Sequence, residues 1–323
     1  MLVSKTPLRV SFLGGGTDFP WFFEEHGGAV VSAAINQHIF ISAIDSFDGK
    51  TTYLKYSKYE EVLDPKQIQH PIFREVISGS RNPAQDISVM AEIPAGNGLA
   101  SSSAFTIGLI NLLARRAGKK LTPEQLASMA INLELDQLGE PIGVQDQLGS
   151  AFAGVNFHRF DKGRRFKTVP LVDNIKDFPF EMVLIKVGKQ SRSASKFTEL
   201  QRTFVESDKG ALARLIELRD LSLEAGKTLA HDISRLPDFV REGWNLKRAS
   251  NPSSINEEIE ALGGKVEKLG AAAWKLVGAG GGGFVLAICK QGERNNLTSK
   301  MRSEGARLID VEIDFKGANV IEV

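Results

Sequence analysis

The sequence predicts an α+β protein with two domains, and three observations support this prediction. The chain has 323 residues, which exceeds the size at which a single hydrophobic core keeps growing. A series of strand-like segments comes first, before the long helical patterns. The strands and helices that follow alternate less regularly than in a doubly wound α/β protein. We therefore expect a sheet-rich first domain over residues 1–173 and a second domain over residues 174–323.

The first half begins with apolar runs of strand length, each bounded by Gly, Asp, Asn, Pro or charged residues. These runs predict strands over residues 7–14, 28–35, 38–45, 51–57 and 86–94. Another strand is expected over residues 151–160. The segment that follows, residues 161–174, is polar and basic, and we expect it to connect the two domains.

Two helices are predicted between these strands. The first follows three consecutive serines and extends over residues 105–118, with leucines on one face, two arginines near its end and a terminal glycine. The second begins at Thr122, which forms a capping box with Gln125 and is followed by Pro123 at the first helical position. Gly139 marks the end of this second helix.

The second half starts with an apolar strand and continues with long helical patterns. We predict strands over residues 180–188, 284–289 and 307–315, and helices over residues 211–226 and 238–250.

Composition excludes several classes of function. The chain carries 40 basic and 39 acidic side chains, so its net charge is +1, and no basic run predicts binding to nucleic acid or to an anionic membrane. A small charged metabolite is the expected partner. The single cysteine, Cys289, lies in an apolar run, and the five histidines show no ligand spacing, so we expect no transition metal. Without a signal peptide or an apolar span, a cytoplasmic protein is expected.

The segment PAGNGLASSSAF, Pro94 to Phe105, has the chemistry of a phosphate-binding loop. Its glycines reach backbone conformations closed to other residues, and its serines lie where a helix has unpaired N–H groups and a positive dipole end. The alternative is that the serines only cap a helix and the glycines only form a turn. The nucleotide-binding residues predicted here are Pro94, Gly96, Gly98, Leu99, Ala100, Ser101, Ser102 and Ser103.

Two other nucleotide-binding patterns fit less well. A lysine-bearing P-loop needs a GK[ST] tripeptide, which the chain lacks. The pattern GxGxxG does occur from Gly278 to Gly283, but it precedes a strand, whereas a dinucleotide site follows a strand and opens a helix.

Four stretches together resemble the GHMP kinases over nearly the whole chain. They are PLRVSFLGGGTDFP at the start, PAGNGLASSSAF, the pair LEL and VQDQ around Glu134 and Asp146, and GAGGGGF from Gly278. The resemblance implies an N-terminal domain like the second domain of ribosomal protein S5, a ferredoxin-like α+β C-terminal domain and an active site in the cleft between them. It also implies transfer of the γ-phosphoryl group of ATP, with Mg²⁺, to a small molecule.

The resemblance also implies roles for individual residues. Ser102 and Glu134 would ligate Mg²⁺, whose preferred ligands are hard oxygens. Asp146 would be the catalytic base, with Arg9 holding it ionised and stabilising the transferring group. Without the family, Glu134 would be an exposed carboxylate on a helix face, Asp146 a turn or cap acceptor and Arg9 a strand arginine. One departure is Ala100, where the family usually has glycine, and this puts nucleotide affinity in question.

The motifs GGGTD, VQDQ and GAGGGGF resemble most the sugar-kinase branch that includes D-glycero-D-manno-heptose 7-phosphate kinase and the fucokinases. The implied reaction phosphorylates the anomeric hydroxyl of a heptose 7-phosphate or a related hexose. A fucokinase or other hexose 1-kinase, and an inactive ATP- or sugar-binding regulator, are the alternatives, and self-association as a homodimer stays open. The substrate-binding residues implied are Gly15, Gly16, Thr17, Asp18, Arg192, Lys247, Gly280, Gly281 and Gly282.

Two of these assignments have simpler alternatives. Arg192 and Lys247 would recognise a sugar phosphate, but they are equally compatible with surface charges. Thr17 and Asp18 would also serve as a helix cap before FPWFFEEHG.

Overall fold

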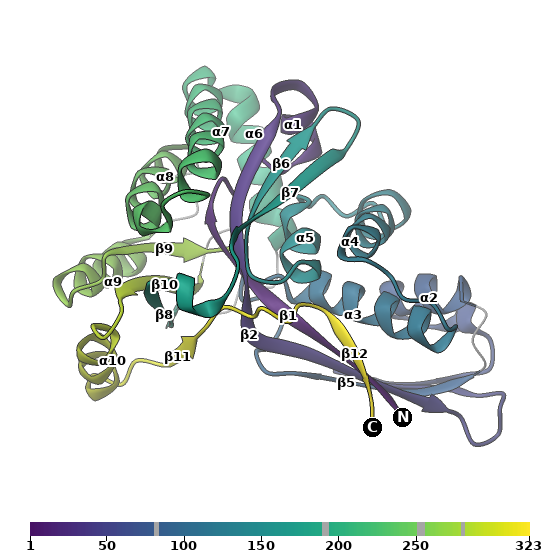
Figure 1. The fold of residues 1–323 in the computed structure, drawn as a ribbon. Coiled ribbons are helices and arrows are strands. Elements are labelled where there is room, and N and C mark those ends of the chain that lie inside the picture. The colour runs from purple at the N-terminus through teal and green to yellow at the C-terminus, as the bar shows by residue number, and fades with distance from the viewer. Residues whose placement is uncertain (81–83, 189–193, 251–255, 279–281) are drawn as a thin grey trace.

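The computed structural model describes residues 1–80, 84–188, 194–250, 256–278 and 282–323. Within these ranges the chain forms two β-sheets with helices packed on both, so the predicted two-domain α+β class is confirmed (Figure 1). None of the helices in the described ranges combines the length and the apolar character needed to cross a bilayer.

The first sheet has the strand order β12-β1-β2-β5-β3-β4, and β6 pairs with both β2 and β7. Its strands are β1 (Leu2–Leu13), β2 (Gly28–Asp45), β3 (Thr52–Lys55), β4 (Tyr59–Val62), β5 (Gln85–Ala91), β6 (Val155–Asp161), β7 (Arg165–Val172) and β12 (Asn319–Glu322). Its associated helices are α1 (Pro20–His26), α2 (Pro71–Ser78), α3 (Ser101–Arg116), α4 (Pro123–Ile131) and α5 (Gln145–Ala151).

The second sheet is antiparallel, in the order β11-β8-β10-β9. Its strands are β8 (Phe180–Val187), β9 (Ala273–Val277), β10 (Gly283–Lys290) and β11 (Leu308–Val311). The helices of this half are α6 (Ala194–Ser207), α7 (Lys209–Leu229), α8 (Leu236–Ser250), α9 (Glu257–Lys268) and α10 (Arg294–Ser303). Helix α7 packs on β2, whereas α8 packs on β9 and β1, so these helices join the two sheets.

The first predicted helix begins four residues earlier than expected, because the three serines belong to it, whereas the second begins at its capping box. Helix α3 starts at Ser101, and nearly all its positions up to Leu113 are buried. Helix α4 has the expected capping box: the Thr122 hydroxyl accepts a hydrogen bond from the Gln125 backbone N–H, and the Gln125 side chain accepts one from the Thr122 backbone N–H.

Two expectations about the first sheet were wrong. Residues 28–35 and 38–45 form the single strand β2, because the two residues between them are accommodated by a register shift: Leu8 of β1 pairs with Ile35 and Pro7 with His38. The segment 161–174, expected to be a connection, contains strand β7, whose first residues alternate between exposed and half-buried positions as it pairs with β6.

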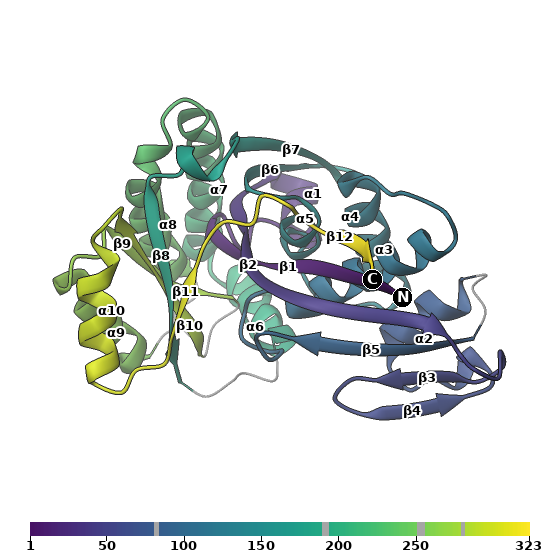
Figure 2. The same cartoon turned by 60° about the horizontal axis from the view of Figure 1, so that its bottom comes forward.

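The end of the chain returns to the first sheet. Strand β12 pairs antiparallel with β1 over Leu2 to Lys5, so the two termini lie side by side (Figure 2). The expected second domain, residues 174–323, therefore contributes its last strand to the sheet of the first.

Candidate active site

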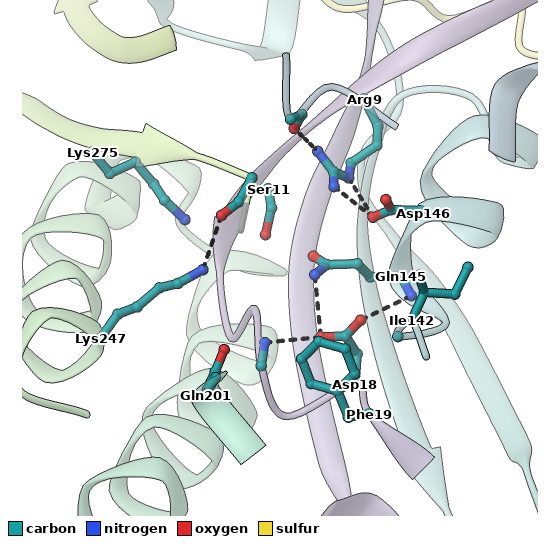
Figure 3. Close-up of a pocket in the computed structure, with 14 residues that line it drawn as sticks. Arg9, Ser11, Asp18, Phe19, Ile142, Gln145, Asp146, Gln201, Lys247 and Lys275 are labelled. Carbon is teal, nitrogen blue, oxygen red and sulfur yellow. Dashed lines mark hydrogen bonds and ion pairs between the residues drawn. The ribbon is translucent and has the colours of Figure 1, made fainter. Parts of the chain in front are cut away.

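A pocket lies where the two halves of the chain meet, and its lining comes from both (Figure 3). Strand β1 and the glycine loop after it form one wall, and the start of α5 forms another. Helices α6 and α8, Lys275 in the middle of β9 and Gly278 just after that strand close the remaining side. Of the residues predicted from the sequence, Arg9, Gly16, Asp18, Gly98, Asp146 and Lys247 line this pocket.

Arg9 and Asp146 form an ion pair inside the pocket. Asp146 Oδ1 accepts hydrogen bonds from Arg9 Nε at 3.1 Å and from Arg9 Nη2 at 2.5 Å. The third donor, Nη1, is 2.8 Å from the carbonyl oxygen of Gly98 in the phosphate loop. The Arg9 side chain is 4% exposed and that of Asp146 is 32% exposed. The guanidinium therefore orients the carboxylate while leaving it accessible to a bound molecule.

Asp18 is buried at the base of the pocket and is held by protein donors. Its Oδ1 accepts hydrogen bonds from the Gly16 backbone at 2.9 Å and from Gln145 Nε2 at 3.1 Å, and its Oδ2 accepts one from the Gln145 backbone at 3.2 Å. Burial raises the pKa of Asp18; the Gly16 N–H opposes the shift, and the nearby Asp146 charge adds to it. Because a carboxylate offers about four acceptor positions, Asp18 retains capacity for a ligand hydroxyl.

The glycine loop before Asp18 fits closely against the second half of the chain. A Cβ on Gly16 would lie 2.6 Å from Gln201 Nε2, and one on Gly15 would lie 3.3 Å from Lys247 Nζ. Thr17 does not reach the pocket, because its hydroxyl is fully buried and bonded to the backbone of Gly14 and Ala29.

The helix-cap alternative for Thr17 and Asp18 is wrong. The N-cap of α1 is Phe19, and no side chain caps the helix.

The backbone of the segment before α3 is left-handed at three residues. Gly96, Gly98 and Ala100 all have positive φ, of 83°, 78° and 64°. Ala100 therefore has a left-handed backbone conformation, which costs energy for alanine but not for glycine. The family usually has glycine at this position. Pro94 accepts a hydrogen bond from Asn97, and Leu99 is a fully buried core residue whose carbonyl oxygen binds the Arg9 backbone.

The three serines at the start of α3 differ in environment. Ser101 Oγ is buried and, among the described residues, has no hydrogen-bond partner. Ser102 is exposed, and Ser103 Oγ donates to Glu134 Oε2 at 2.8 Å.

Glu134 is 1% exposed, so the alternative role as an exposed helix-face carboxylate is wrong. It continues the buried face of α4 at helical spacing from Ala127 and Ala130, and the turn that carries it, Asn132–Gln137, is π-helical. Thr106 Oγ1 donates to Glu134 at 2.5 Å, and Gln147 Nε2 also donates to it. Burial raises the pKa of Glu134, an effect that these hydrogen bonds oppose.

The surroundings of Glu134 bear on the expected Mg²⁺ site, although no group of three or more His, Cys, Asp or Glu side chains within the described ranges could hold a metal ion. The hydrogen-bond partners of Glu134 are neutral, and a buried carboxylate is normally paired with a charge or coordinates a metal. Glu134 and the serine hydroxyls are oxygen donors of the kind that Mg²⁺ prefers.

The glycine-rich turn after β9 packs directly on the phosphate loop. A Cβ on Gly98 would lie 2.6 Å from the carbonyl oxygen of Val277, and one on Gly283 would lie 2.9 Å from that of Asn97. Gly282 is buried and has a φ of 138°. Arg192, Gly280 and Gly281, which the sequence also nominated, lie outside the described residues.

The structure adds pocket residues that were missed in the sequence. Ser11, Gln145, Gln201 and Lys275 also line the pocket. Among the described residues, Ser11 Oγ, Gln145 Oε1 and Gln201 Nε2 are buried without a hydrogen-bond partner. These atoms could bind a polyhydroxylated ligand. The signal for Lys275 was present, since it is the only charged residue in the run AAAWKLVGAG.

Comparisons with known sequences extend the resemblance. The family model for the GHMP kinases N terminal domain matches residues 69–154, and that for the GHMP kinases C terminal matches residues 211–307. D-glycero-alpha-D-manno-heptose 7-phosphate kinase of Campylobacter jejuni is 25% identical over 97% of this chain and 97% of its own length. The bifunctional fucokinase/GDP-fucose pyrophosphorylase of Arabidopsis thaliana is 24% identical, and the match covers 96% of this chain but 32% of that protein.

A solved structure gives the same architecture. D-glycero-D-manno-heptose 1-phosphate kinase from Bacteroides thetaiotaomicron superposes with a TM-score of 0.79 at 20% identity, over 100% of this chain and 99% of that one. At this identity the likeness concerns the fold.

Proposed function

Because the chain belongs to the GHMP kinase family, whose members are ATP-dependent phosphotransferases, we propose that it phosphorylates the anomeric hydroxyl of a sugar. The acceptor that we propose is D-glycero-D-manno-heptose 7-phosphate, and the product is the 1,7-bisphosphate. The similarity to the Campylobacter jejuni enzyme over nearly both whole lengths supports this acceptor.

The observation that carries the proposal is the Arg9–Asp146 pair. It lies in the pocket with the buried carboxylate of Asp18, and Arg9 also touches the phosphate loop through Gly98. One guanidinium thus links a candidate base to a candidate triphosphate site, which is the arrangement that phosphoryl transfer needs.

The reaction follows from these positions. The backbone N–H groups at the start of α3 hold the triphosphate, and Asp18 with Gln145 positions the sugar. Asp146 accepts the proton of the anomeric hydroxyl while the oxygen of that hydroxyl bonds to the γ-phosphorus of ATP. The bond between the γ-phosphorus and the ADP oxygen breaks at the same time. Arg9 orients Asp146 through two hydrogen bonds and offsets negative charge on the transferring group. Ser102 and Glu134 would hold Mg²⁺, which when bound neutralises charge on the phosphates.

A substrate panel tests the proposal. ADP release would be measured with heptose 7-phosphate, fucose, mannose and galactose, and phosphorus NMR would locate the new phosphate. We expect the highest kcat/KM with the heptose 7-phosphate and a new anomeric phosphate signal. Preferential turnover of an unphosphorylated hexose would replace this acceptor with that of a hexose 1-kinase, a candidate that the fucokinase similarity favours. ATP binding without turnover of any sugar would identify a regulator instead.

Arg192 and Lys247 are proposed as cations for the phosphate of the acceptor, and a homodimer and a cytoplasmic location remain predictions.

A further inference from the structure

Lys275 is a buried lysine that faces the pocket. It is 3% exposed, in the middle of β9, all of whose residues are buried. Its neighbours Trp274 and Leu276 belong to the core on the far side of the second sheet, whereas Ala273 and Val277 belong to the core shared with the first. Alternation along the strand therefore directs Lys275 towards the first half of the chain.

The Lys275 ammonium lacks a carboxylate partner. Its Nζ donates to the carbonyl oxygen of Phe12 at 3.1 Å, and among the described residues no carboxylate lies within ion-pair distance. One hydrogen bond leaves two further N–H donors. Burial, together with the charges of Lys247 and Arg9, lowers the pKa of Lys275 well below its usual range. A buried cation without a counter-charge is costly to the free protein, and a bound anion would remove that cost.

Lys247 of α8 lies in the same part of the pocket. Its Nζ is 3.4 Å from the carbonyl oxygen of Gly278, and a Cβ on Gly15 would lie 3.3 Å from it. Both lysines face Asp146 and Gln145 across the pocket (Figure 3). Gly278 itself touches the phosphate loop at Gly98. Lys247 thus lies between the loop expected to hold the nucleotide and the loop expected to hold the sugar, and Lys275 lines the same pocket.

We propose that Lys275 and Lys247 form a phosphoryl-binding pair, contributed by the second half of the chain to a pocket whose base comes from the first. The two ammonium groups bind the oxygens of a phosphoryl group. The assignment rests on the proposed kinase function for the source of that group, which is either the phosphoryl in transfer or the phosphate of the acceptor.

The binding test uses thermal unfolding with saturating ADP and Mg²⁺, no sugar, and increasing inorganic phosphate. Lys275→Met and Lys247→Met remove the two charges, and Lys290→Met, at an exposed end of the adjacent strand β10, is the matched control. We expect phosphate to raise the Tm of the parent protein and of the control. The apparent affinity for inorganic phosphate should fall at least about tenfold in both Lys275→Met and Lys247→Met. This is the loss expected when one hydrogen bond to a charged group is removed.

The same titration separates this role from a structural one. Without phosphate, Lys275→Met should have a higher Tm than the parent, because it no longer buries an uncompensated charge. A lower Tm with unchanged protection by phosphate would mean that Lys275 only ties β9 to Phe12, and would overturn the proposal. So would a parent protein that phosphate does not protect. If Lys275→Met fails to fold, Lys247→Met carries the test, and unchanged protection in it overturns the pair.

Turnover then identifies the source of the phosphoryl group. If the lysines bind the group in transfer, kcat of Lys275→Met should fall about 10²- to 10³-fold with phosphorylated and unphosphorylated acceptors alike. A loss confined to KM for the phosphorylated acceptor would assign the pair to the acceptor phosphate. A protein with phosphate protection and no turnover would reject the kinase proposal while leaving the binding pair intact.

Discussion

Gly98 of the phosphate loop and Gly278 of the glycine-rich turn touch through their backbones, although 180 residues separate them in the chain. A Cβ on Gly278 would lie 2.5 Å from the Cα of Gly98, and one on Gly98 would lie 2.8 Å from the Cα of Gly278. Both residues have positive φ. The second half of the molecule thus braces the loop that we expect to hold the nucleotide.

Gly278→Ala should therefore impair nucleotide use. The added methyl must displace Gly98, and a shift of about 1 Å in such a loop is expected to lower kcat/KM for ATP about a hundredfold. Gly270→Ala is the matched control, since Gly270 also has positive φ but no atom would lie within 4 Å of its Cβ. Steady-state kinetics would show the contact to be unimportant if both variants lost activity equally.

Ala100 holds a left-handed conformation, with φ 64° and ψ 31°. Glycine adopts this conformation without strain, so Ala100→Gly should raise the free energy of unfolding by about 0.5–1 kcal/mol. Ala114→Gly, inside α3, should lower it by about 1 kcal/mol. Urea unfolding of both variants measures the contrast, and a destabilised Ala100→Gly protein would show that strain at this residue is negligible.

The fully buried His158 makes stability depend on pH. Its ring nitrogens are 2.9 Å from Thr168 Oγ1 and 3.2 Å from Ser32 Oγ. Burial lowers the pKa of His158 to about 3 from 6.5. The unfolded chain therefore binds a proton at His158 below about pH 6.5 while the folded protein does not. The contribution of His158 to the free energy of unfolding should therefore fall by about 2 kcal/mol when the pH is lowered from 7 to 5.

Urea titrations of His158→Gln measure this contribution. The variant should lack that part of the pH dependence, whereas replacement of the exposed His231 by Gln should retain it. Equal slopes in His158→Gln and the parent protein would contradict the assignment.

The sequence predicted the elements whose signals are local. The capping box at Thr122 and the apolar runs of β8 and β10 depend on neighbouring residues, and the structure has them where expected. Glu134 could not be placed this way, because its hydrogen-bond partners Ser103, Thr106 and Gln147 come from α3 and α5, which no local pattern of its own helix contains. Strand β7 was missed because its exposed face carries the charged residues of a connecting segment.

The pocket residues also divide into those that a sequence motif identifies and those that only the fold brings to the pocket. Arg9, Asp18 and Asp146 were identified because each lies in a motif with family context. Gln201 lies in none: its proximity to Gly16 depends on how α6 packs, a relationship spanning 185 residues that no local pattern contains. Lys275 was detectable in the sequence as a single charge within an apolar run, which forms a fully buried strand. That its side chain points towards the pocket follows only from how the two halves of the chain pack together.

Asp18 should act on the sugar rather than on ATP. Asp18→Ala should raise KM for the sugar about 10- to 100-fold, as expected for loss of hydrogen bonds to a charged group, and leave KM for ATP unchanged. Gln145→Ala should have a smaller effect, because Asp18 keeps its bonds to the Gly16 and Gln145 backbone. A parallel rise in both KM values for Asp18→Ala would argue that Asp18 only organises the pocket.

The most direct test of the account is the turnover of Asp146→Asn, measured beside its affinity for ATP. Arg9 and Gly98 remain in this variant, so nucleotide binding by calorimetry should match the parent protein. Loss of the general base should lower kcat at least about a hundredfold. A variant that binds ATP and turns over sugar at the parental rate would contradict the assignment of Asp146, and with it the proposed chemistry of the pocket.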